Sequence, residues 1–348
     1  MNRVCNHLAT YLAILLFFNV AGPAFAEQPL LRDDHPQRYT VIRGDTLWDI
    51  AGRFLRQPWR WPDIWYVNPQ VANPHLIYPG DRLELVYLNG KPRLRLGGRG
   101  HRTVKLSPGI RSSAWDGAIP TIPVDAIAPF LSRPYVLGEG EAEAAPYIVA
   151  FADDHVLGGA GLRAYVRSLD AVGDKYHVIR PGEPYRDGDT GEVLGHEAVY
   201  IGAVESTRSG DPATVFFNSS QLESVIGDRL LPVGNERPWS HFTPGRPNGR
   251  VNGSIISVLN GVSQIGQYNV VVIDRGAREG LQPGHVLRID RRGEKIRDVI
   301  TPVSADTVTL PDEEAGVLMV FRSFERVSFG LVLNAVKPIH LQDRVRTP

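Results

Sequence analysis

Residues 38–86 restrict the fold more than any other part of the chain, because four short patterns follow one another within 49 residues. Residues 38–42 alternate polar and apolar side chains and predict a short strand. Residues 47–54 and 61–67 predict two helices, and residues 82–86 predict a closing strand. The first helix carries apolar residues at i, i+3, i+4 and i+7, namely Leu47, Ile50, Ala51 and Phe54. The predicted order is therefore strand, helix, helix, strand.

Local signals mark where the two predicted helices begin and end. Residues 43–46 predict a turn in which Asp45 or Thr46 caps the first helix. Thr46 precedes Asp49 by three positions, a spacing typical of a capping box. Asn68 stands before a proline, which disfavours the α region and predicts the end of the second helix.

The fixed residue types in this stretch resemble a LysM module. The motif is Tyr39-x-Val41-x-x-Gly44-Asp45-Thr46-Leu47-x-x-Ile50-Ala51, then Asn68, then Ile77-x-Pro79-Gly80-Asp81-x-Leu83. The resemblance covers about one seventh of the chain. It implies a βααβ fold and binding to polymers that contain N-acetylglucosamine, chiefly peptidoglycan in bacteria. The aromatic insert at residues 58–62 departs from the shorter polar link of many such modules and puts the width of the groove in question.

By this resemblance, the walls of a glycan-binding groove would be residues 44–47 and 73–77. An N-acetyl group presents an amide donor, an amide acceptor and a methyl face, and a helix start offers N–H groups that lack a partner within the helix. A structural alternative stays open, in which Asp45 only caps a helix while Leu47 and Ile77 only pack a core. The expected glycan-binding residues are Gly44, Asp45, Thr46, Leu47, Asn73, Pro74, His75, Leu76 and Ile77.

Four of the six tryptophans fall in the same stretch, namely Trp48, Trp59, Trp61 and Trp65. A small domain has little core, and large aromatic side chains supply burial where area is scarce. We expect Trp61 and Trp65 to serve that purpose. Trp48 lies off the apolar stripe and is expected to contact either a sugar face or a partner protein. Trp59 is the second candidate for aromatic contact with the glycan.

Residues 1–26 have the features of an export signal. Arg3 gives a charged start, residues 11–20 are apolar apart from Asn19, and residues 24–26 offer an A-x-A cleavage site. The apolar run is too short for a membrane span, so we expect no transmembrane anchor in the mature chain. Cleavage after Ala26 predicts a periplasmic protein.

Cleavage also fixes the charge and thiol content of the mature chain. It removes the one cysteine, Cys5, and one basic residue, which leaves 37 basic and 38 acidic residues. A near-neutral chain argues against a nucleic-acid partner. Without disulfides, an exported chain of this length must rely on two or three packed cores.

Composition then divides the rest of the chain. Residues 27–37 form a polar leader, residues 38–87 the LysM-like domain, and residues 88–134 a connector that is rich in Pro, Ser and Ala over 107–133. The basic stretch at 88–102 is expected to be a solvated linker or a hairpin. The alternative is that its charges meet carboxylates of peptidoglycan stem peptides or other anionic polymers.

From residue 135 onward the pattern is mostly β. Short apolar runs separated by Pro, Gly and Asp turns predict small barrels or sandwiches. We expect two related units, at 135–235 and 250–348, joined by a linker at 236–249. The segments matched between the units are 147–151 with 268–273, 161–166 with 284–289, 202–205 with 316–321, and 227–232 with 342–348. The candidate strands of the first unit are 147–150, 163–166, 176–179, 198–202 and 214–217.

The sequence offers no recognisable catalytic or metal centre, and we expect no cofactor. The mature chain lacks a thiol nucleophile, and it contains neither H-E-x-x-H nor G-x-S-x-G. Asp153-Asp154-His155 is a tight cluster of acids with histidine in the β region, and it is expected to be a solvated turn. Spacing alone does not test for a pair of glycan-cleaving carboxylates.

These observations predict an α+β LysM-like module followed by two small β units in a secreted, non-catalytic protein of the cell envelope. The expected ligand is peptidoglycan or another glycan containing N-acetylglucosamine. The β units are expected to brace the module or to present a surface to an envelope protein. Two alternatives stay open: a cell-wall hydrolase with its site in the β units, and an envelope scaffold without sugar binding.

Overall fold

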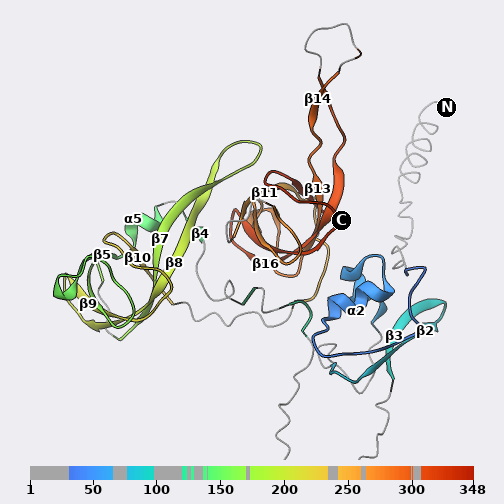
Figure 1. Cartoon of the computed structure of the whole chain (residues 1–348), viewed down its shortest axis with the longest axis horizontal. Coiled ribbons are helices and arrows are strands. Elements are labelled where there is room, and N and C mark those ends of the chain that lie inside the picture. The colour runs from blue at the N-terminus through green and yellow to red at the C-terminus, as the bar shows by residue number, and fades with distance from the viewer. Residues whose placement is uncertain are drawn as a thin grey trace, which may run out of the picture.

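The protein consists of an N-terminal α/β domain, a middle β unit and a C-terminal β barrel, seen in a computed structural model (Figure 1). The structure describes residues 31–65, 77–97, 120–123, 127–128, 136–138, 140–169, 173–233, 242–259, 264–298, 300 and 307–348. The expected export signal lies outside these residues. Among the helices within these ranges, none has the length and apolar character needed to cross a membrane.

The N-terminal domain has the predicted strand, helix, helix, strand order with one further strand. Its sheet has the order β1-β2-β3, and all of its pairs are antiparallel. A single 3-10 turn precedes the second helix, which is shorter than predicted. The elements are β1 (Arg38–Thr40), α2 (Leu47–Phe54), η1 (Pro58–Arg60), α3 (Trp61–Ile64), β2 (Arg82–Leu88) and β3 (Lys91–Gly97).

Helix α2 begins at a complete capping box. The Thr46 hydroxyl oxygen accepts a hydrogen bond from the Asp49 N–H at 3.1 Å, while the Asp49 carboxylate accepts from the Thr46 N–H at 3.3 Å. The predicted apolar stripe is buried and packs against the sheet through Leu83 and Leu94. The sequence prediction for this helix is confirmed in both its start and its buried face.

Strand β3 corrects the predicted start of the connector. Residues 91–97 pair with β2 across a turn at Asn89 and Gly90, both of which have positive φ. Leu94 is buried in the core of the N-terminal domain, and Arg95 pairs with Glu84 at 3.1 Å. The basic stretch is therefore a hairpin as far as Gly97, and the domain extends ten residues beyond the expected boundary at residue 87.

The middle unit is one antiparallel sheet that closes on itself. The strand order is β4-β8-β7-β10-β5-β6-β9, and the further pairing of β8 with β9 joins six of these strands into a ring. All five strands predicted for this region lie within β5 to β9. The elements are β4 (Val136–Leu137), α5 (Glu141–Ala144), β5 (Tyr147–Phe151), η2 (Ala152–Asp154), β6 (Arg163–Arg167), β7 (Lys175–Arg186), β8 (Val193–Arg208), β9 (Ala213–Ser220) and β10 (Arg229–Pro232).

The C-terminal unit is a closed barrel with the strand order β11-β12-β17-β16-β13-β18. A two-stranded ribbon, β14 with β15, projects away from this barrel (Figure 1). The elements are β11 (Asn252–Val258), β12 (Val270–Ile273), η3 (Ala277–Glu279), β13 (Val286–Arg291), β14 (Lys295–Arg297), β15 (Thr307–Thr309), β16 (Glu313–Ser323), β17 (Ser328–Ala335) and β18 (Arg344–Arg346).

The two rings have the same strand order along the chain. If the six strands of a ring are numbered in chain order, their order around the ring is one, two, five, four, three, six in both units. The segments matched in sequence agree with this order for β8 with β16 and for β10 with β18. The other two matches are wrong by one strand, because residues 147–151 form the first strand of their ring whereas residues 268–273 lead into the second.

Ion pairs and a hydrogen bond join the tip of the long β7–β8 hairpin to the barrel. The Arg275 guanidinium lies 2.7 Å from the Asp187 carboxylate and 3.3 Å from that of Asp274, which also accepts a hydrogen bond from the Gly188 N–H. Arg344 pairs with Asp189 at 3.1 Å at the edge of the same contact. Asp187 and Asp274 are buried, so these charges stabilise the contact only while they remain paired.

The Asp187 carboxylate should make this contact sensitive to acid. Burial alone would raise its pKa, but the Thr190 N–H, the Arg275 guanidinium and the Asp189 N–H outweigh burial and lower the pKa from 3.8 to about 2. The ionised form therefore stabilises the fold above about pH 4, by about 2 kcal/mol, and this contribution is lost as the pH falls towards 2.

We expect the free energy of unfolding to fall by about 2 kcal/mol more for the wild type than for Asp187→Asn between pH 5 and pH 2. Urea denaturation at a series of pH values measures this difference. Parallel pH profiles for the two proteins would contradict the assignment.

Candidate functional site

The loop before α2 supplies the first of the two predicted groove walls. The buried Asp45 carboxylate accepts hydrogen bonds from the Tyr39 hydroxyl and the Ile42 N–H, each at 2.9 Å. This side chain therefore fixes the loop. Gly44 is exposed with a φ of +92°, and nothing lies within 4 Å of the position that a Cβ would take. The exposed surface of the wall is consequently backbone at Gly44.

The other described wall residues turn their side chains inward. Thr46 caps α2, whereas Leu47 and Ile77 are buried in the core of the N-terminal domain. Their contribution to a ligand would come from backbone N–H and C=O groups. Asn73, Pro74, His75 and Leu76 lie outside the described residues, so the second wall remains a prediction apart from Ile77.

A short piece of the connector, residues 120–122, contacts the first turn of α2. The Leu47 N–H donates to the Pro120 carbonyl at 3.0 Å, and the Trp48 N–H donates to the Thr121 carbonyl at 3.1 Å. The next residue, Ile122, is fully buried. We call residues 120–122 the strap. The sequence placed them in an extended connector and did not predict that they touch the site.

Trp48 and Trp59 are buried between the domains. Their exposed fractions are 4% and 7%, and both belong to a hydrophobic cluster that includes Ile122 and barrel residues such as Phe321. The Arg246 guanidinium lies 5.1 Å from the centre of the Trp59 ring. In this arrangement both indoles contact protein, and stacking on a sugar would require the domains to separate.

Trp61 and Trp65, by contrast, pack within the N-terminal domain itself. Their rings meet edge to face, with centroids 6.1 Å apart. Trp61 is buried in the domain core, and Trp65 packs against it while partly exposed. These positions agree with the structural purpose expected for this pair.

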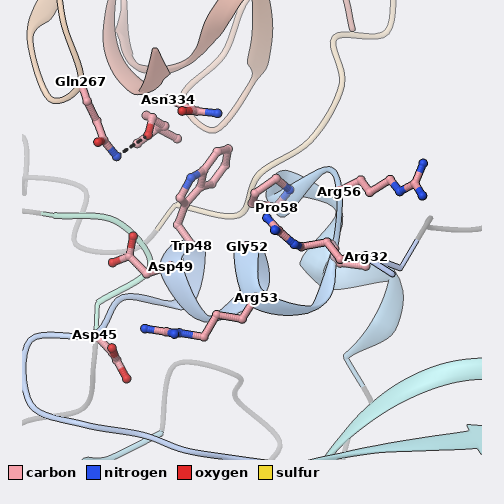
Figure 2. Close-up of a pocket in the computed structure, with 12 residues that line it drawn as sticks. Arg32, Asp45, Trp48, Asp49, Gly52, Arg53, Arg56, Pro58, Gln267 and Asn334 are labelled. Carbon is pink, nitrogen blue, oxygen red and sulfur yellow. Dashed lines mark hydrogen bonds between the residues drawn. The ribbon is translucent and has the colours of Figure 1, made fainter. Parts of the chain in front are cut away.

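An open cleft of about 560 Å³ runs between α2 and the barrel (Figure 2). Burial is the main cause that raises the pKa of the Tyr268 hydroxyl of the barrel, and the Asp49 carboxylate of α2 raises it further. The cleft is lined by Arg32, Asp45, Trp48, Asp49, Gly52, Arg53, Leu55, Arg56 and Pro58 from the N-terminal domain, and by Gln267, Leu333 and Asn334 from the barrel.

Two of the arginine side chains that line this cleft form ion pairs with aspartates at the surface. Arg32 pairs with Asp34 and Arg56 with Asp33, both at the exposed surface, where ion pairs contribute little. The Arg53 guanidinium lies 4.7 Å from the centre of the Tyr39 ring. Within the described parts of the chain, three or more His, Cys, Asp or Glu side chains nowhere gather in a way that could hold a metal ion.

The sequence profile of the LysM domain family matches residues 39–85, from β1 to the middle of β2. Residues 39–85 are a LysM domain. A curated relative, the uncharacterized protein YqbP of Bacillus subtilis (strain 168), is 40% identical over 60 residues, which make up 14% of this chain and 27% of the relative. The chain therefore matches only about a quarter of that relative's length. LysM domains are in general non-catalytic modules that bind peptidoglycan or chitin, and they are typical of extracellular and envelope proteins.

Proposed function

We propose that this protein binds peptidoglycan, through N-acetylglucosamine-containing glycan, without cleaving it. The LysM domain supports this function. The main structural observation in its favour is the exposed loop at Gly44. A fixed backbone loop beside a helix start suits recognition of an N-acetyl group, because it offers N–H groups that lack a partner within the helix. Asp45 would hold the loop in place, and the backbone of Thr46, Leu47 and Ile77 would complete the described part of the groove.

The β region would brace the LysM domain and offer a surface to a partner protein of the envelope. The cluster around Trp48 and Trp59 supports bracing, since it includes side chains from the LysM domain, the β7–β8 hairpin and the barrel. We also propose that the β region consists of two related units, at about 135–235 and 250–348. Their common strand order supports this relation.

The proposed location is the periplasm, after removal of residues 1–26. The charged start, the apolar run and the A-x-A site support export. A single shallow groove should bind its glycan with a dissociation constant of roughly 1 µM to 1 mM. A polymeric wall would strengthen attachment only where several copies are tethered together.

The first test is sedimentation of the chain from residue 27 onward with insoluble peptidoglycan. We expect the protein in the pellet and no soluble muropeptides in the supernatant. Release of muropeptides would place an enzyme in the β region, and absence of pelleting would favour an envelope scaffold that does not bind sugar.

Gly44→Trp is expected to weaken pelleting by at least tenfold, because it places a large side chain on the exposed wall. Gly90→Trp is the matched control. Gly90 also has a positive φ, of +74°, and open space around its Cα, but it lies in the β2–β3 turn. Both substitutions cost a similar backbone strain of about 1–3 kcal/mol. Equal binding by the two variants would reject the proposed wall.

A further inference from the structure

The strap occupies the part of α2 that would otherwise offer hydrogen-bond donors to a glycan. The first N–H groups of a helix have no partner within the helix. In α2, the Asp49 N–H is satisfied by the Thr46 hydroxyl, which leaves the N–H groups of Leu47 and Trp48. Both of these donate to the strap, at 3.0 Å and 3.1 Å.

The acceptors of the strap are chemically equivalent to those of the ligand. Pro120 and Thr121 contribute amide carbonyl oxygens, and the acetamido group of N-acetylglucosamine also presents an amide carbonyl oxygen. A single N–H group does not donate at full strength to two acceptors at once. We propose that the strap is an internal competitor of the glycan, so that full engagement of the LysM groove requires the strap to leave α2.

Burial of the Ile122 side chain holds the strap in position, and we call this buried position the seat. The side chain is fully buried and shares a cluster with Trp48, Trp59 and barrel residues. The same cluster joins the LysM domain to the barrel, so release of the strap is coupled to loosening of that contact. The apparent glycan affinity is then the intrinsic affinity multiplied by the fraction of molecules in which the strap has left α2. This inference rests on the proposed glycan binding of the LysM domain.

The test uses Ile122→Asp in the chain from residue 27 onward, because a carboxylate in the seat should expel the strap. We expect this variant to bind insoluble peptidoglycan about tenfold more tightly than the wild type. Ile122→Val is the matched control, since it keeps an apolar branched side chain in the seat, and it should bind like the wild type.

Hydrogen exchange supplies a readout that does not depend on the ligand. The amides of Leu47 and Trp48 should exchange faster in Ile122→Asp than in the wild type, while amides of β12 and β17 keep their protection. If the far-UV circular dichroism of Ile122→Asp departs from that of the wild type, Ile122→Ala takes its place with the same expectations.

The outcomes separate the two proposals. Faster exchange at Leu47 and Trp48 without tighter binding would overturn the competition and leave glycan binding intact. Unchanged exchange at both amides in a folded variant would overturn the role of Ile122 as the seat of the strap. Failure of both wild type and variant to sediment with peptidoglycan would overturn glycan binding and the competition together.

Discussion

Replacing Arg275 with alanine is expected to lower the free energy of unfolding by about 3–5 kcal/mol. The guanidinium is 17% exposed and lies against the carboxylates of Asp187 and Asp274, of which the second is fully buried. Its loss would leave two buried charges without a cationic partner. Burial already raises the pKa of Asp274, so this carboxyl is the one most affected. Urea denaturation followed by circular dichroism measures the change.

The matched control is Arg167→Ala in the middle unit. Arg167 pairs with Asp211 at 3.0 Å, a distance similar to that in the buried contact, but both side chains are 54% exposed. An exposed ion pair contributes little to stability, because water and salt screen it. Similar losses for Arg167→Ala and Arg275→Ala would show that burial does not govern the Arg275 contact.

Trp48→Ala is expected to destabilise the contact between the LysM domain and the barrel by about 3–5 kcal/mol. Trp48 lies outside the core of its own domain and fills the cluster shared with Phe321 and Val270. We therefore expect the LysM core to stay folded while the two domains separate. Hydrogen exchange should rise at the contact and remain slow in β2.

Tyr87→Ala is the control for this aromatic truncation. Tyr87 lies on β2 of the same domain and is 58% exposed, so its removal should change stability by no more than about 0.5 kcal/mol. A change below about 1 kcal/mol for Trp48→Ala would contradict a tightly packed contact.

The sequence was sufficient where local chemistry decides the structure. The stripe from Leu47 to Phe54 and the Thr46–Asp49 spacing predicted α2, because caps and periodicity act within one helix. The alternation of side chains could also have predicted strand β3. Pro92 and Leu94 alternate with Lys91, Arg93 and Arg95, but the run of basic residues left a solvated linker open beside a hairpin.

Contacts between distant segments were beyond such reasoning. Trp48 lies off the apolar stripe of α2, and the barrel residues of its cluster, such as Val270 and Phe321, follow more than 200 positions later in the chain. Nothing in its neighbours distinguishes burial against a barrel from contact with a sugar. The motif indicates the loop at Gly44 as a candidate groove wall, which stays a prediction, but no local pattern predicts that residues 120–122 contact the helix beside it.

The strap shows how a correct local rule can hide a contact. The prolines at 120 and 123 disfavour a central strand, and this rule predicts a connector for the segment. A proline nevertheless keeps its carbonyl oxygen, and the residues between the two prolines keep theirs. Such a segment can satisfy donors of another element without entering a sheet.

The contact between the first and last domains also determines how mechanical load would pass through the molecule. Through Trp48 and Trp59, tension applied at the groove reaches the barrel directly and need not travel along the backbone of the middle unit. The middle unit lies in sequence between two domains that contact each other. Its own contact with the barrel is made by the tip of the β7–β8 hairpin (Figure 1). While that contact is intact, a load on the LysM domain would reach the barrel at a fixed offset, and the six-stranded ring of the middle unit would carry little of the strain.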